Sequence, residues 1–112
     1  MAYANYRYKG QNFIGETHGE HLIPLAGLTA VGPETSAELL ANAARLTESP
    51  VALSEVTLRA ASPRAEKILC VGLNYKDHAA DASAAATFPV LFPKYTSTLI
   101  GPAEDIILPP SP

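Results

Sequence analysis

The sequence has few of the features that are typical of secreted proteins or of proteins that bind a highly charged partner. Its single cysteine, Cys70, cannot form an internal disulfide, so a disulfide-stapled secreted domain is excluded. Only 17% of its 112 residues are charged, below the ~25% typical of soluble domains. The eight Lys and Arg residues are scattered and the net charge is −3. We therefore expect no nucleic-acid and no anionic membrane partner, since both require clustered positive charge.

Long hydrophobic runs are also missing. The longest apolar stretch near the middle, residues 68–73, is far shorter than the ~18 residues needed to cross a bilayer. The N-terminus has no apolar segment typical of a signal peptide. Glycine and proline together make up 17 of the 112 residues, a smaller share than the ~25–30% that signals a disordered chain. These absences predict a soluble, cytoplasmic protein with a core of modest size.

What is present divides into two segments. In the first, residues 6–9 alternate aromatic and basic side chains, which predicts a half-exposed strand. Further strands are expected at residues 13–14 and 22–25, with Gly15, Gly19 and Gly27 as separators and a turn over residues 16–20. Pro24 predicts an edge position for the strand it belongs to, because proline cannot donate to a ladder.

A helix is expected next, followed by another short strand. Thr35 or Ser36 can cap the helix, and Ser49-Pro50 ends it. An apolar stripe at helical spacing is formed by Leu39, Leu40, Ala43 and Leu46. Residues 56–58 are typical of a short strand.

The second segment follows a polar, proline-marked stretch. Residues 67–72 predict a buried strand that contains Cys70, residues 74–86 a helix, and residues 90–92 and 105–108 two more strands. The predicted fold class is therefore α+β: a small N-terminal α+β domain (residues 1–60), a linker (61–66) and a second part (67–112). The few strands of this second part leave sheet edges open, and such a small sheet is only marginally stable in water.

The densest polar cluster, residues 74–81, directly follows the predicted buried strand. His78 and Asp81 are three residues apart, so on a helical turn they share a face, and a carboxylate beside an imidazole makes a water-activating base. The alternative is a surface histidine near a solvated aspartate. Lys94 is either an anion-binding group or a solvated edge charge. His18, Glu20 and His21 match no zinc motif and indicate a polar hairpin tip.

The sequence of the second segment resembles that of a known protein family. Residues 67–80 resemble the opening motif of the catalytic domain of the fumarylacetoacetate hydrolase family, and residues 89–94, 97, 99–102 and 106–109 continue its pattern in the same order. Residues 1–60 resemble, more weakly, the small domain that precedes it. The resemblance implies the start of a mostly β catalytic domain, a homo-oligomer, a Mg²⁺ or Mn²⁺ site, and isomerisation, C–C bond hydrolysis or decarboxylation of 2-oxo or enol dicarboxylic acids, as in aromatic catabolism.

The resemblance also implies site residues. His78 corresponds to the family's catalytic histidine, Asp81 to a position that usually holds its paired glutamate, and Lys94 to the lysine on the substrate side. The family's metal ligands are a Glu-x-Glu pair and a later aspartate, and this sequence contains no Glu-x-Glu. We therefore expect an incomplete catalytic domain that binds no metal and is inactive by itself. The alternative is a non-enzymatic remnant or a module that completes its sheet with another chain.

Overall fold

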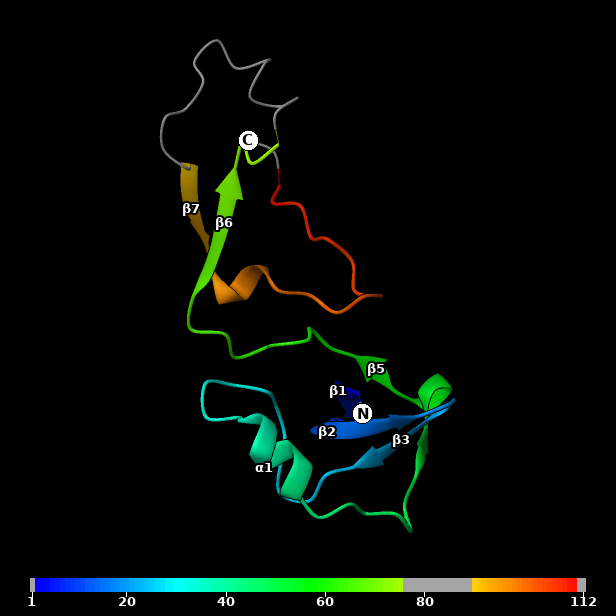
Figure 1. The fold of residues 1–112 in the computed structure, drawn as a ribbon. Coiled ribbons are helices and arrows are strands. Elements are labelled where there is room, and N and C mark those ends of the chain that lie inside the picture. Colours follow the sequence, from blue (N-terminus) through cyan, green and yellow to red (C-terminus); the bar gives the residue numbers. More distant parts are fainter. Residues whose placement is uncertain (1, 76–89, 111–112) are drawn as a thin grey trace. The chain divides into compact units, whose positions relative to one another are not determined.

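The computed structural model describes residues 2–75 and 90–110, which form two compact units. The first unit comprises Met1–Glu66 and Leu99–Pro112, and the second comprises Lys67–Thr98. Among the residues described, no helix is long and apolar enough to cross a membrane. In chain order (Figure 1) the elements are β1 (Tyr3–Tyr8), β2 (Gln11–His18), β3 (His21–Pro24), α1 (Ala37–Asn42), β4 (Val51–Ala52), the 3₁₀ turn η1 (Leu53–Glu55), β5 (Thr57–Leu58), β6 (Ile68–Gly72), β7 (Val90–Lys94) and the 3₁₀ turn η2 (Thr96–Thr98).

The first unit is built on a five-stranded sheet in the order β4-β3-β2-β1-β5, with every neighbouring pair antiparallel. Two-residue loops join its first three strands. Lys9 and Gly10 both have positive φ, as a tight hairpin turn with the right twist requires. Gly19 and Glu20 form the second loop, so the predicted turn is shorter than residues 16–20 and Glu16 to His18 belong to β2.

One face of this sheet carries most of the core. Tyr6 lies opposite Phe13 in the register and the two rings stack with centroids 5.5 Å apart. Leu22 and Val51 are paired on the neighbouring strands and both are buried. Alternation along the strands brings these four side chains to the same face, as the period-2 pattern of residues 6–9 indicated in part.

Gly15 is part of the middle of β2, where it pairs with Ala4 on one side and Pro24 on the other. A Cβ at Gly15 would lie 2.9 Å from Cε1 of Tyr6, a distance that real Cβ contacts essentially never show. Gly15 therefore makes room for the Tyr6 ring. The prediction that this glycine separates two strands was wrong, because a strand glycine can equally mark a close approach of a neighbour.

The strand that contains Pro24 is not at an edge, since β4 pairs with its first half. Pro24 is the last residue of β3, beyond the reach of the two-residue β4. Its carbonyl accepts a hydrogen bond from the Leu46 backbone N–H at 2.9 Å. The prediction of an edge position was therefore wrong, because β3 lies between β4 and β2 in the sheet.

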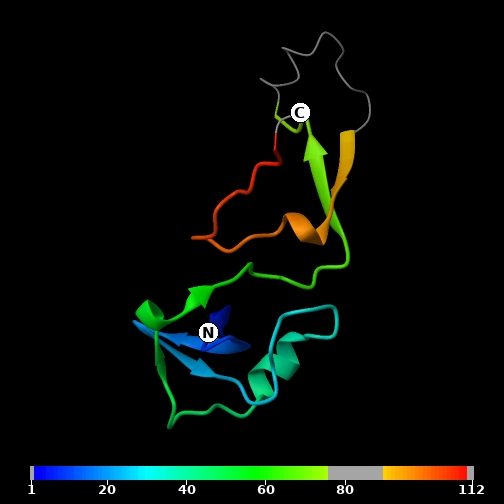
Figure 2. The ribbon, with the colours of Figure 1, turned by 180° about the vertical axis from the view of Figure 1, so that it is seen from behind.

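The helix starts as predicted and ends early. The Ser36 hydroxyl accepts from the Leu39 N–H at 3.0 Å and caps α1, but the helix stops at Asn42 rather than at Ser49. Beyond it the backbone is extended, and Ala44 and Leu46 hydrogen-bond to residues 24–26 instead. Pairing with the end of β3 outweighs the helical periodicity, and Leu39 and Leu46 stay exposed. In both views α1 lies beside the sheet (Figures 1 and 2).

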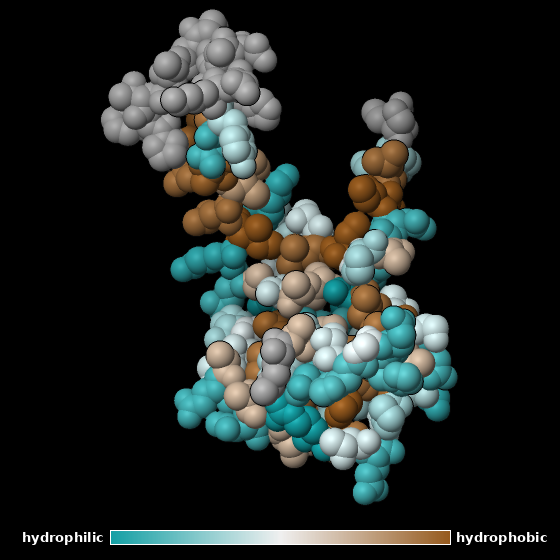
Figure 3. Space-filling view, turned by 45° about the vertical axis from the view of Figure 1, so that its right-hand side comes forward, coloured by the Kyte–Doolittle hydropathy of each residue, from teal (hydrophilic) through white to brown (hydrophobic). Residues whose placement is uncertain are grey.

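The second unit contains the hairpin β6–β7, with Ile68 opposite Lys94 and Gly72 opposite Val90. Both strands match the predicted positions, but the strand at residues 68–72 is not buried: Leu69 is 68% exposed. Hydrophobic (brown) side chains accordingly lie at the surface in Figure 3. Cys70 is of intermediate burial.

Residues 105–108 are not a strand. Ile107 there is 90% exposed, and its backbone is paired with no strand of the part of the chain that the structure describes. Gly101, by contrast, is buried in the first unit, where an added Cβ would lie 2.2 Å from the carbonyl oxygen of Leu58. The chain after Leu99 is therefore held next to β5 by a close backbone approach.

Candidate functional site

Two of the three predicted site residues, His78 and Asp81, lie outside the described residues. The segment that contains them joins the paired ends of the hairpin, because Gly72 and Val90 are opposite each other. Leu73, the first residue after β6, has a φ of 53°, so the chain turns sharply as it leaves the strand. The roles of His78 and Asp81 stay predictions.

Lys94 is the last residue of β7 and is exposed. It pairs with Ile68 at the end of the hairpin opposite to Val90. At ~3.3 Å per residue, Lys94 is about 13 Å along the strand from the point where the segment with His78 and Asp81 joins it. Its ammonium lies 5.6 Å from the centroid of the Phe92 ring, a cation–π contact that orients the side chain along the strand.

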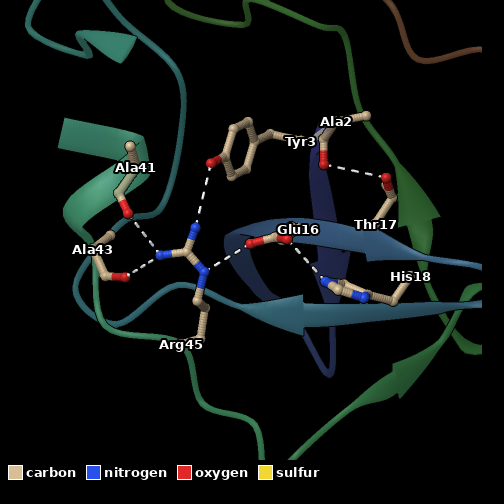
Figure 4. Close-up of polar contacts among 8 residues, drawn as sticks. All are labelled: Ala2, Tyr3, Glu16, Thr17, His18, Ala41, Ala43 and Arg45. Carbon is tan, nitrogen blue, oxygen red and sulfur yellow. Dashed lines mark hydrogen bonds and ion pairs between the residues drawn. The ribbon is translucent and has the colours of Figure 1, made fainter. Parts of the chain in front are cut away.

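The polar cluster with the best-defined geometry in the described chain lies in the first unit, around Glu16 (Figure 4). The Glu16 side chain is only 9% exposed. One carboxylate oxygen accepts from Arg45 Nε at 2.7 Å, and the other is 2.9 Å from Nε2 of His18. Arg45 also donates to the carbonyls of Ala41 and Ala43 at 2.9 and 2.8 Å.

Charge and hydrogen bonding in this cluster reinforce each other. The hydrogen bond from Arg45, then that from His18, holds the pKa of the Glu16 carboxyl below its usual value, although burial acts in the opposite direction. The same carboxylate raises the pKa of Arg45. Nη2 of Arg45 reaches the Tyr3 hydroxyl at 3.4 Å. The guanidinium thus connects β1 and β2 with the carbonyls at the C-terminal end of α1. Its role is structural.

Sequence reasoning missed Glu16 and Arg45. Glu16 was assigned to a turn and Arg45 falls within the longer helix that was predicted, so nothing linked two residues 29 positions apart. The alternation of β2 was the available signal, since it places Glu16 opposite Tyr3. His18 and His21 are paired at the ends of β2 and β3 and flank the loop with Glu20, so the prediction of a polar hairpin tip is confirmed; His18 also contacts the Glu16 carboxylate.

No three His, Cys, Asp or Glu side chains gather to hold a metal ion anywhere in residues 2–75 and 90–110. A hard cation such as Mg²⁺ requires several oxygen ligands in near-octahedral geometry. The described residues therefore do not fit the family's metal, and we derive no step through one. The prediction of Mg²⁺ or Mn²⁺ stays an implication of the resemblance.

Comparison with known proteins connects the chain to enzymes. Rat oxaloacetate tautomerase Fahd2a is 43% identical over 58 residues, which are 51% of this chain and 18% of the tautomerase. The orangutan (Pongo abelii) fumarylacetoacetate hydrolase domain-containing protein 2 is 38% identical over 58 residues. The 2,4-didehydro-3-deoxy-L-rhamnonate hydrolase of a Sphingomonas strain is 32% identical over 97% of this chain and 39% of its own length. The chain is therefore similar to proteins of the fumarylacetoacetate hydrolase family.

This similarity rests on individual relatives, since no family model matches the chain. The chain spans less than two fifths of the length of the fumarylacetoacetate hydrolase relatives described above. Their names cover one isomerase activity, the tautomerisation of oxaloacetate, and one hydrolase activity. The family resemblance seen in residues 67–109 is thereby confirmed, and the likeness to isomerases and hydrolases with it.

Proposed function

We propose that this chain takes part in the tautomerisation of a 2-oxo dicarboxylic acid, in the manner of an oxaloacetate tautomerase. The observation that carries the proposal is the 43% identity to the rat tautomerase over half of the chain. The similarity to a rhamnonate hydrolase over nearly the whole chain supports hydrolysis of a related acid as the second reaction type. Both reactions require a general base: tautomerisation removes a proton from carbon, and hydrolysis activates a water molecule.

In this proposal His78 moves the proton. Tautomerisation breaks one C–H bond beside the ketone and forms one O–H bond on the ketone oxygen, so no other reactant is consumed. A neutral imidazole accepts the proton from carbon, and its conjugate acid returns a proton to oxygen. Asp81 would fix the imidazole orientation and raise its basicity.

Lys94 is proposed to stabilise the negative oxygen of the enolate. Its exposed ammonium is free to meet an anionic substrate, and a fixed positive charge at that oxygen favours the enolate over the ketone. The metal of the family, the homo-oligomer and the cytoplasmic location stay predictions.

The decisive experiment transfers the residues of this chain into an active relative. Residues 67–109 would replace the corresponding segment of the rat tautomerase, and enol formation from oxaloacetate would be followed by ultraviolet absorbance. We expect the chimera to stay active and His78→Asn in it to lower the rate by about 10²–10⁴-fold, the usual contribution of a general base.

Matched variants separate chemistry from structure in the same chimera. Asp81→Asn and Lys94→Gln should lower the rate, whereas Asp105→Asn and Lys67→Gln, which change exposed residues of the same charge, should not. An inactive chimera, or equal rates in the His78 variant and the parent, would refute the proposed role of this chain.

A specific observation also favours the second candidate, a non-enzymatic module that completes its sheet with another polypeptide. The β6–β7 hairpin is apolar on both faces, and its register places Leu69, Val71 and Leu91 together on one exposed face. Two strands alone are marginal in water, so such a hairpin is typical of the interior of a larger sheet. A monodisperse, cooperatively folding monomer in sedimentation and thermal unfolding would argue against this candidate.

A further inference from the structure

The first unit contains a cavity of about 320 Å³ whose lining includes none of the residues of the proposed reaction. Its lining includes two arginines, two asparagines and a threonine: Arg59, Arg64, Asn5, Asn12 and Thr29. This volume is near the lower limit of the ~300–1,000 Å³ of typical small-molecule pockets. The cavity therefore suits a ligand of only a few heavy atoms.

The cavity is a built feature of the fold, because a buried side chain fixes its boundaries. Asn5 is 5% exposed, and its amide oxygen accepts from the Val31 N–H at 2.8 Å. Its amide nitrogen donates to the Ala61 carbonyl at 2.7 Å. One side chain on β1 thus holds both the segment that carries Thr29 and the segment that carries the two arginines.

Further backbone contacts set the arginine segment in place. The Arg59 N–H donates to the Asn5 carbonyl at 2.8 Å, and the Arg64 N–H donates to the Val31 carbonyl at 3.3 Å. Both arginines therefore belong to a segment, residues 59–64, whose backbone is hydrogen-bonded at each end. Little ordering of the backbone is then left for a ligand to accomplish, which favours binding.

The charges that face the cavity are positive. Arg59 pairs with Glu104 at 3.8 Å and Arg64 pairs with Glu34, but neither carboxylate lines the cavity. A guanidinium has five N–H donors, so one carboxylate contact leaves others available. Asn12 and Thr29 add neutral groups able to donate hydrogen bonds to oxygen.

We infer that this cavity binds a small organic carboxylate. Arginine matches the planar carboxylate with paired, charge-assisted hydrogen bonds, and the amide and hydroxyl groups are suited to its remaining oxygens. The site is independent of the proposed proton transfer, because none of its residues belongs to the second unit.

The test titrates succinate into the purified 112-residue chain at constant ionic strength and follows the backbone amide signals of residues 5, 12, 29, 59 and 64 by NMR. We expect saturable shifts at these positions. The Arg64→Gln variant should weaken binding by about ten-fold, since it removes charge-assisted hydrogen bonds. Unchanged signals at saturating succinate would overturn the inference. It would also be overturned if inorganic phosphate, and not succinate, produced saturable shifts at these positions.

Two further variants distinguish a binding role from a structural one. Glu34→Gln removes the competing carboxylate from Arg64 and should tighten succinate binding several-fold, an effect that a merely structural pair would not produce. Arg7→Gln, an exposed arginine on β1 that does not line the cavity, should leave the affinity unchanged. Thermal unfolding of each variant shows whether it is folded. Equal affinities in the Arg64, Glu34 and Arg7 variants would refute the site.

Discussion

At the scale of single residues, the first unit depends on a few buried polar groups. Glu16 joins Arg45 and His18, and Asn5 joins three separate segments of the backbone. Both Glu16 and Asn5 have partners more than 20 positions away in the sequence, and leaving one of these groups unsatisfied costs more than the bond itself contributes. These positions are therefore the most sensitive to a conservative substitution.

Glu16 should make stability depend on pH. Its pKa is lower in the folded chain than the ordinary 4.5, so its contribution is present above that value and is lost as pH falls through the folded pKa. We expect Glu16→Gln to lower the thermal midpoint at pH 7 and to have much less effect in strong acid. The measurement is thermal unfolding of both proteins between pH 7 and pH 2. A constant difference across that range would contradict the assignment.

Removing the polar group of Tyr6, unlike that of Glu16, should not destabilise the folded chain. The Tyr6 hydroxyl is buried with no hydrogen-bond partner among the residues that the structure describes, and burial raises the pKa of Tyr6. Tyr6→Phe removes that unsatisfied group and keeps the ring, so we expect a free energy of unfolding unchanged or higher by about 1 kcal/mol. Tyr3→Phe is the matched control, because the Tyr3 hydroxyl reaches Arg45 and its loss should destabilise. Chemical denaturation of both variants measures the difference.

At the scale of elements, strand pairing decides where segments begin and end. The helical stripe through Leu46 is interrupted because residues 44–46 pair with residues 24–26, and β2 continues through Gly15 because the Tyr6 ring needs the space. Local pattern is a weak guide where a neighbouring strand offers a complete set of backbone hydrogen bonds.

Gly15→Ala tests this explanation of β2. The added methyl would meet Tyr6, the Ile23 carbonyl and the Leu22 side chain at 2.9–3.2 Å, so the sheet must shift to admit it. We expect a loss of about 1–3 kcal/mol in the free energy of unfolding, as for other overpacked sites. The double variant Gly15→Ala with Tyr6→Leu should recover part of the loss in urea denaturation. An unaffected single variant would show that the ring is not what requires the glycine.

At the scale of the whole molecule, the second unit exposes apolar residues. Leu69 and Leu91 lie on the same face of the hairpin and are 68% and 59% exposed. Such a face on an open-edged hairpin favours pairing with another chain. We therefore expect this face to govern any self-association of the protein.

Charged substitutions on that face should reduce self-association. We expect Leu69→Lys combined with Leu91→Lys to shift the chain toward the monomer in sedimentation velocity, because burying two ammonium groups between copies is costly. Leu46→Lys, which charges an exposed leucine of the first unit, is the control and should leave the association unchanged. Equal effects of the two changes would point to net charge alone as the cause.

The amino-acid sequence by itself determined the resemblance to the fumarylacetoacetate hydrolase family, through the motifs of residues 67–109, and the positions of most strands and of the Ser36 cap. These features are local: alternation, capping and motif are complete within a few residues. Only the tertiary structure decided the end of the helix, the interior place of β3, the exposure of Leu69 and the Glu16–Arg45 pair. Each of those depends on a partner at least twenty positions away or on the extent of the sheet, and no short pattern encodes either.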